Sequence, residues 1–130
     1  MTRMPKKTVD LFSQIFLVLQ PPPEMTLSEW ADTYRILSRE SSAEPGHWHT
    51  DKAPYQRPIM NAITNERIQK VVIMSGAQLG KTDIILNTIG YYIHHDPSPM
   101  LVMQPTLAMA EAFSKDRLSP MIRDTPESSE

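Results

Sequence analysis

The chain contains no cysteine and only four glycines among its 130 residues. Without cysteine, a disulfide-bonded scaffold and any thiolate metal site are excluded. Neither charge sign dominates, because 13 Lys and Arg face 15 Asp and Glu, so the chain as a whole lacks the basic surface typical of nucleic-acid binders. No apolar run approaches the roughly 20 residues that span a bilayer. These absences indicate a cytoplasmic protein with no membrane partner, and the length suits one modest domain.

An apolar run over residues 11–19 follows three basic residues, as in a secretory signal. However, Ser13 and Gln14 interrupt it, and three prolines follow at 21–23 in place of small residues at a cleavage site. We predict instead a short amphipathic helix over residues 9–20 that packs on protein and is ended by the prolines.

Further helices are predicted in the first half of the chain. Residues 26–40 begin with a capping box, Thr26 followed three residues later by Glu29. A second helix is predicted over residues 55–64, with Pro58 tolerated in its first turn. In the helix predicted over residues 26–40, the apolar residues recur at helical spacing along one face; they are Leu27, Trp30, Ala31, Tyr34 and Leu37.

The second half alternates between apolar strands and helices. Residues 70–74 (KVVIM) are continuously apolar after the lysine and rich in β-branched side chains, as in a strand buried on both faces. A loop and an apolar helix follow, then a second apolar strand from Met100 and a helix over 107–122 with Pro120 as a candidate break. This order predicts an α/β fold with a parallel sheet. Two strands are too few for a complete sheet.

The loop between the first strand and its helix reads S-G-A-Q-L-G-K-T over residues 75–82. A phosphate-binding P-loop has the pattern G-x-x-x-x-G-K-[ST] in this context, and the last three positions match. Backbone N–H groups at the start of the helix would hold phosphate oxygens, aided by the helix dipole. The candidate nucleotide-binding residues are Ser75, Gly76, Ala77, Gln78, Leu79, Gly80, Lys81 and Thr82.

The loop departs from the pattern at its first position, where Ser75 replaces glycine. A residue with a side chain avoids positive φ, so we expect Gly76 to make the tight turn instead. The alternative is a surface turn that contains Gly-Lys-Thr by chance.

Three blocks of sequence resemble the phage terminase large subunits of the GpA type. The loop and helix SGAQLGKTDIILNTIGYYI are similar to the ATPase motif of that family. The block LSEWADTYRILSRESSAEPGHWHTDKAPYQRPIM resembles its N-terminal lead-in, and DPSPMLVMQPTLAMAEAFSKDRLSPMI resembles the segment after the first ATPase helix. The three blocks stand in the family's order and cover nearly the whole chain.

The resemblance implies a motor that hydrolyses ATP to move DNA into a procapsid, joined to an endonuclease that cuts concatemers. Lys81 would contact the phosphates and Thr82 would bind Mg²⁺, so ATP and Mg²⁺ are the implied cofactors. Gln78 occupies a position that many terminases keep as glutamine, whereas Ala77 replaces an arginine found in related motors. Gln56 falls where helicase-like ATPases read adenine. The implied partners are DNA, the terminase small subunit and the portal or procapsid.

The residues that complete hydrolysis are not apparent. The apolar runs that end at Leu19 and Met103 are followed by Gln20 and Gln104, so neither supplies the acidic residue of a Walker B strand. The acidic metal cluster of a nuclease is missing too, and no catalytic residue is assigned. We expect residues 1–52 to form a helical lead-in and 53–130 the first part of the P-loop ATPase domain, cut off before Walker B and the nuclease.

Two alternatives to an active terminase fragment stay open. One is a different P-loop enzyme, helicase-like or kinase-like, although the lead-in and the Gln-Pro-Thr block speak against a kinase. The other is a non-catalytic prophage remnant. With an incomplete sheet, we expect the chain to be poorly soluble or partly molten on its own.

Overall fold

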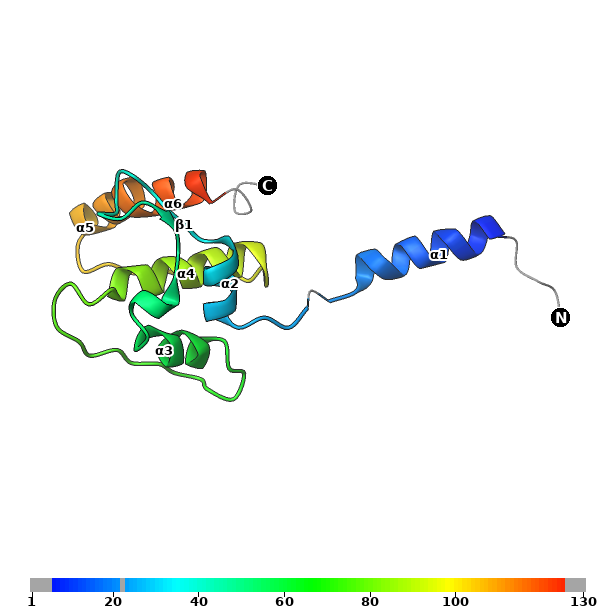
Figure 1. Ribbon diagram of the computed structural model, residues 1–130, viewed down its shortest axis with the longest axis horizontal. Helices are drawn as coiled ribbons and strands as arrows, with labels where there is room; N and C mark the ends of the chain where they lie inside the picture. Colours follow the sequence, from blue (N-terminus) through cyan, green and yellow to red (C-terminus); the bar gives the residue numbers. More distant parts are fainter. Residues whose placement is uncertain (1–5, 22, 126–130) are drawn as a thin grey trace.

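The computed structural model describes residues 6–21 and 23–125 (Figure 1). Helices dominate, and the described residues contain one small sheet, in which β1 and β2 pair antiparallel. In chain order the elements are α1 (Lys6–Leu19), α2 (Leu27–Tyr34), β1 (Ile36–Leu37), β2 (Gly46–His47), the 3₁₀ turn η1 (Thr50–Lys52), α3 (Gln56–Ile63), α4 (Lys81–His94), α5 (Leu107–Ala112), the π-helical segment η2 (Phe113–Leu118) and α6 (Ser119–Asp124).

Helix α1 forms where the sequence predicts it and ends at Leu19, before the prolines. None of its residues is buried, and it lies apart from the rest of the chain (Figure 1). The prediction that it packs on protein is therefore wrong for the described residues. Its apolar side chains are open to solvent, and Phe16 and Val18 are both largely exposed. Within 6–21 and 23–125, no helix has the length and apolarity needed to cross a membrane.

Helix α2 begins with the predicted capping box. The Glu29 backbone N–H donates to the Thr26 hydroxyl, and the Glu29 carboxylate accepts from the Thr26 N–H at 2.8 Å. The helix ends at Tyr34, six residues earlier than predicted, because the backbone becomes extended at Arg35 and pairs with the segment at residues 46–48. Long-range pairing therefore overrides the helical periodicity of this segment.

The main core lies where α2, α3 and α4 meet. Trp30 is fully buried there, and its indole N–H donates to His94 Nδ1 at 2.9 Å. Gly90 of α4 makes this packing possible, because a Cβ at that position would lie 2.4 Å from the Trp30 ring. The core crosses the predicted boundary between residues 52 and 53; its buried members are Leu27, Trp30, Ala31, Trp48, Met60, Ile84 and Tyr91.

A second, smaller core joins the other side of α4 to the C-terminal helical run (Figure 1). Leu86 and Ile89 pack there against Met121. The run from α5 to α6 is continuously helical, and Pro120 does not break it. Instead, the wider π-helical winding of η2 directly precedes the proline, which accommodates its missing N–H and bulky ring.

The two segments predicted as strands are not paired. Residues 70–74 and 100–104 have no regular secondary structure, and their backbones form no hydrogen bonds with other described backbone groups. A strand requires a hydrogen-bonded neighbour, and the described part of the chain offers them none. The observed architecture is thus helix-rich with a two-stranded antiparallel hairpin.

Candidate nucleotide-binding site

The candidate loop connects the extended segment that ends at Met74 to the first turn of α4. Gly80 is the N-cap residue of α4 and has the left-handed conformation, with φ of 75°. Glycine is favoured here because a side chain would be strained at this φ. The helix has no side-chain cap, unlike α2 and α5. Its exposed N–H groups and its dipole therefore make the loop suited to an anion.

Lys81 closes the loop on itself. Its ammonium group donates to the backbone carbonyl oxygens of Ser75 and Gly76, at 2.9 Å in each case. The start of the loop and the start of α4 are thereby brought together around one positive charge. Thr82 follows with an exposed side chain, so its hydroxyl is open to a metal ion or a ligand.

The tight turn of the loop lies at Gln78, which has φ of 58°. Gly76 does not have a positive φ, so the prediction that it makes the turn is wrong. A Cβ at Gly76 would meet only the Leu79 side chain, at the ordinary contact distance of 3.6 Å. The left-handed conformation at Gln78 carries a penalty of about 1–2 kcal/mol for a residue with a side chain.

The backbone N–H groups of the loop are unpaired with protein. Within the described ranges, no N–H of residues 76–83 donates a hydrogen bond to another protein group. Residues 75–79 are exposed, so a ligand can approach this part of the loop. A run of free backbone donors beside a lysine is the arrangement that binds phosphate oxygens. The eight predicted residues therefore lie together in one loop.

The start of α3 contacts Leu79 and Gly80 of the loop. The hydroxyl of Tyr55 donates to the Leu79 carbonyl oxygen at 3.1 Å. Gln56 is only 3% exposed, and its amide packs so closely on Gly80 that a Cβ there would lie 2.1 Å from Nε2. The Gln56 Oε1 atom is buried and has no hydrogen-bond partner among the described residues. Gln56 is thus adjacent to the loop.

A buried polar network links α2 to the first turns of α4. Arg35 is 2% exposed, and it donates from Nε to Asn87 Oδ1 at 3.0 Å and from Nη1 to the Ile36 carbonyl. Burial raises the pKa of Asp83, while Arg35 and Arg117 act in the opposite direction. Burial also lowers the pKa of Arg35, and Asp83 partly offsets this effect. The residue directly after Thr82 is therefore a half-buried carboxyl near two arginines.

Sequence reasoning missed this network. Arg35 lies just past the end of α2, and Asp83 and Asn87 are polar positions in an otherwise apolar helix. A polar residue in an apolar helix is the signal that could have indicated a buried contact. Its partner is 52 residues away in the chain, and no local pattern identifies such a partner.

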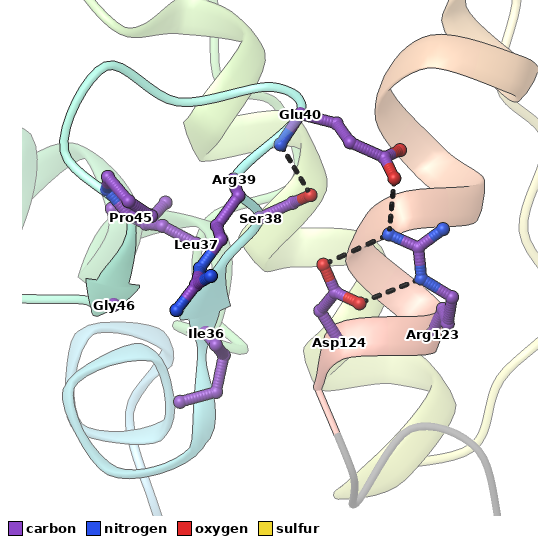
Figure 2. Close-up of a pocket in the computed structure, with 9 residues that line it drawn as sticks. All are labelled: Ile36, Leu37, Ser38, Arg39, Glu40, Pro45, Gly46, Arg123 and Asp124. Carbon is purple, nitrogen blue, oxygen red and sulfur yellow. Dashed lines mark hydrogen bonds and ion pairs between the residues drawn. The ribbon is translucent and has the colours of Figure 1, made fainter.

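A hollow of about 600 Å³ lies between the β1–β2 hairpin and α6 (Figure 2). None of its lining residues belongs to the candidate loop. Arg123 donates to both carboxylate oxygens of Asp124, at 2.8 and 3.2 Å, and also forms an ion pair with Glu40 (Figure 2). Because two carboxylates already satisfy this arginine, the ion pairs join the hairpin to α6 and leave little positive charge for an anion.

The chain is similar to known phage proteins. The model of the family described as phage terminase large subunit gpA, ATPase domain, matches residues 42–130. The terminase large subunit of Enterobacteria phage P21 is 38% identical over 105 residues, which cover 81% of this chain. That of Escherichia phage lambda is 37% identical over 109 residues, or 84% of this chain. In both cases the match spans 16% of the relative's length. No solved structure matches the chain.

Proposed function

Because the chain belongs to the family of the phage terminase large subunit gpA, ATPase domain, we propose that residues 75–82 bind the phosphates of ATP. The observation that carries the proposal is the closed loop itself. Lys81 spans it from the start of α4 to the carbonyl groups of Ser75 and Gly76, and the backbone N–H groups between them form no hydrogen bond with described protein groups.

Each loop residue has a role in this proposal. Lys81 would turn its ammonium from the two carbonyls toward the phosphate oxygens, and the exposed Thr82 hydroxyl would bind Mg²⁺. Gly80 would let the backbone approach the phosphates. Residues 75–79 would contribute N–H groups. When bound, Mg²⁺ supplies charge neutralisation to the phosphates.

Gln56 is proposed to contact the nucleotide base. Its buried Oε1 lacks a donor among the described residues, and an amino group of adenine is a donor of the required kind. Its position against Gly80 places the amide next to the loop. Satisfying a buried acceptor would favour binding, because an unpaired buried polar atom costs about 1–3 kcal/mol.

The parallel sheet of a P-loop domain also remains a proposal. Residues 70–74 and 100–104 would be strands of that sheet, flanking α4 in sequence as a strand–loop–helix–strand unit requires. Their apolar side chains support this, since Met74 and Leu101 are among the most exposed apolar residues described. We propose residues 1–52 as the helical lead-in and 53–130 as the start of the ATPase domain.

At the level of the whole protein, we propose that this segment serves a motor that hydrolyses ATP to package phage DNA. The relatives are terminase large subunits, and the proposed partners are DNA, the terminase small subunit and the portal or procapsid. On the same ground, we propose that the whole protein also has endonuclease activity and that it works in the cytoplasm of a bacterial host. The net charge of −2 gives this segment no basic surface of its own for DNA.

Isothermal titration calorimetry of the chain with ATP, with and without Mg²⁺, tests the proposal. We expect Lys81→Ala to weaken ATP binding more than tenfold under both conditions, since it removes the charge that contacts the phosphates. Thr82→Ala should weaken binding only when Mg²⁺ is present. Lys115→Ala removes an exposed lysine whose ion pair with Glu111 spans 3.9 Å, and it should leave affinity unchanged. Equal affinities for all four proteins would rule out the loop as the site.

A further inference from the structure

We propose that Tyr55 is a positioning residue that orients the Leu79–Gly80 peptide of the loop, an inference that rests on the proposed phosphate site. Tyr55 precedes α3 and is separated from Leu79 by 24 residues in the chain. Its hydroxyl donates to the Leu79 carbonyl oxygen at 3.1 Å, slightly longer than the usual range for an O–H···O hydrogen bond. The bond therefore connects the start of α3 directly to the proposed phosphate-binding loop.

Peptide geometry converts this bond into control of a phosphate donor. The Leu79 carbonyl and the Gly80 N–H belong to one planar trans peptide, in which the two groups point in opposite directions. Because Tyr55 holds the carbonyl toward itself, the Gly80 N–H must point away from Tyr55. The hydroxyl thereby fixes one backbone donor of the loop without contacting a ligand itself.

Gln56 acts on the same part of the loop from the next position in the chain. Its amide contacts the α-carbon side of Gly80, where there is no room for a Cβ. Consecutive residues at the start of α3 therefore hold consecutive residues of the loop. This pairing restricts rotation of the peptide about both of its ends.

Helix α3, which Tyr55 precedes, is packed firmly against the rest of the molecule. Met60 of α3 is fully buried in the main core. Asn61 Oδ1 accepts from the Ser28 N–H, and the Thr64 hydroxyl accepts from the Leu27 N–H, both at 3.3 Å. A hydrogen bond from α3 can therefore position the loop, because its donor belongs to a packed element.

An alternative role for Tyr55 is direct contact with the nucleotide base. Its ring is 51% exposed, so an aromatic ligand could reach it. The two roles differ in which ligands they affect. Positioning of the loop alters the binding of any ligand that carries phosphates, whereas contact with the base alters the binding of ATP alone.

The experiment compares Tyr55→Phe with the unchanged chain using two probes, ATP–Mg²⁺ and inorganic tripolyphosphate–Mg²⁺. The variant keeps the ring and removes the hydroxyl. Loss of one hydrogen bond corresponds to about a three- to tenfold weaker affinity, and we expect the same factor for both probes. Order parameters from ¹⁵N relaxation of Leu79 and Gly80 in the ligand-free chain should also fall. Tyr92→Phe is the matched control, because no hydrogen bond of the Tyr92 hydroxyl is found in the described structure.

The outcomes separate this inference from the proposed function. A loss confined to ATP, or unchanged affinities together with unchanged order parameters, would overturn the positioning role. If the unchanged chain binds neither probe, the proposed function fails. The order parameters of Leu79 and Gly80 then test the positioning role of Tyr55 on their own. If these order parameters fall in Tyr55→Phe but not in Tyr92→Phe, the positioning role is supported. Equal order parameters in the two variants contradict it.

Discussion

Gly80 is the residue at which the backbone and its surroundings constrain the loop most tightly. Its φ of 75° lies in the region that favours glycine, and the Gln56 amide occupies the space that a Cβ would fill. The same residue is the N-cap of α4. One glycine therefore permits the turn, the contact with α3 and the start of the helix that follows.

Asp83 gives stability a pH dependence close to the site. Burial raises the pKa of Asp83 above its ordinary value of 3.8, so the folded chain holds this proton more tightly than the unfolded chain. Its contribution to stability is fully present below pH 3.8 and is lost as pH rises through the folded pKa. We therefore expect Asp83→Asn to remove this loss and to increase stability at pH 7 relative to the unchanged chain.

Urea unfolding at pH 7 and at pH 4 measures this effect as a difference between the two proteins. The gain in the free energy of unfolding from Asp83→Asn should be larger at pH 7 than at pH 4. Asp116→Asn is a suitable control because Asp116 is exposed on η2, and a substitution on the surface should change stability little. A gain from Asp83→Asn that does not change with pH would show that attraction to Arg35 and Arg117 balances the effect of burial on the Asp83 pKa.

The P-loop pattern predicted the position of a loop before α4 but not all of the conformation of that loop. Gly80, Lys81 and Thr82 follow from the pattern, and the structure places them at the start of α4. The turn at Gln78 was missed because the expectation relied on glycine as the residue for positive φ, and Gln78 takes that conformation in spite of its Cβ. The bond from Tyr55 was missed because it joins distant segments and leaves no local pattern.

The helices were predicted more reliably than the strands because their signals are local. The capping box at Thr26 and the prolines after Leu19 mark helix ends within a few residues of sequence. Strands require partners from elsewhere in the chain. The end of α2 at Tyr34 and the unpaired state of residues 70–74 and 100–104 both depend on such partners.

Helices α2, α3 and α4 are tied together by Asn87. Its Oδ1 accepts from the buried Arg35, and its Nδ2 donates to Met60 Sδ at 3.5 Å. Asn87→Ala would leave a buried guanidinium N–H without its acceptor. We expect a loss of about 1.5–3 kcal/mol in the free energy of unfolding, the range for hydrogen bonds to charged groups.

Chemical denaturation of Asn87→Ala and Thr88→Ala measures this difference within one helix. Thr88 bonds the backbone of its own helix, so its replacement should cost less than about 1 kcal/mol. Similar losses in the two variants would mean that the Arg35–Asn87 bond adds nothing beyond local helix effects.

The molecule as a whole exposes apolar side chains in the two segments proposed as strands. Val72 is 69% exposed and Leu101 is 85% exposed. Contiguous exposed apolar surface favours association, and an extended segment without a neighbour can pair with another chain. The chain should therefore bind an apolar dye and self-associate as its concentration rises.

Replacing Val72 and Leu101 together by serine should reduce dye fluorescence and self-association without lowering the unfolding midpoint. These side chains bury little area, so little stability depends on them. In contrast, Leu86→Ser alters the second core and should cost about 2–5 kcal/mol. Sedimentation and fluorescence with 8-anilinonaphthalene-1-sulfonate measure the outcome. Unchanged dye binding in the double variant would place the associating surface elsewhere.

The family was correctly predicted from three blocks of sequence, and the match over residues 42–130 confirms it. These blocks carry more information than the loop alone, since Gly-Lys-Thr occurs in many P-loop proteins. The parallel sheet could not be tested in the same way, because the described chain leaves the two segments unpaired.

Thermal unfolding of the chain with and without ATP–Mg²⁺ tests the central claim most directly. A ligand that binds the folded state alone, at a hundred times its dissociation constant, adds about 2.7 kcal/mol of stability. We predict a rise in the unfolding midpoint for the unchanged chain and no rise for Lys81→Ala at the same nucleotide concentration. An equal rise in both proteins, or no rise in the unchanged chain at any concentration, would contradict nucleotide binding at this loop.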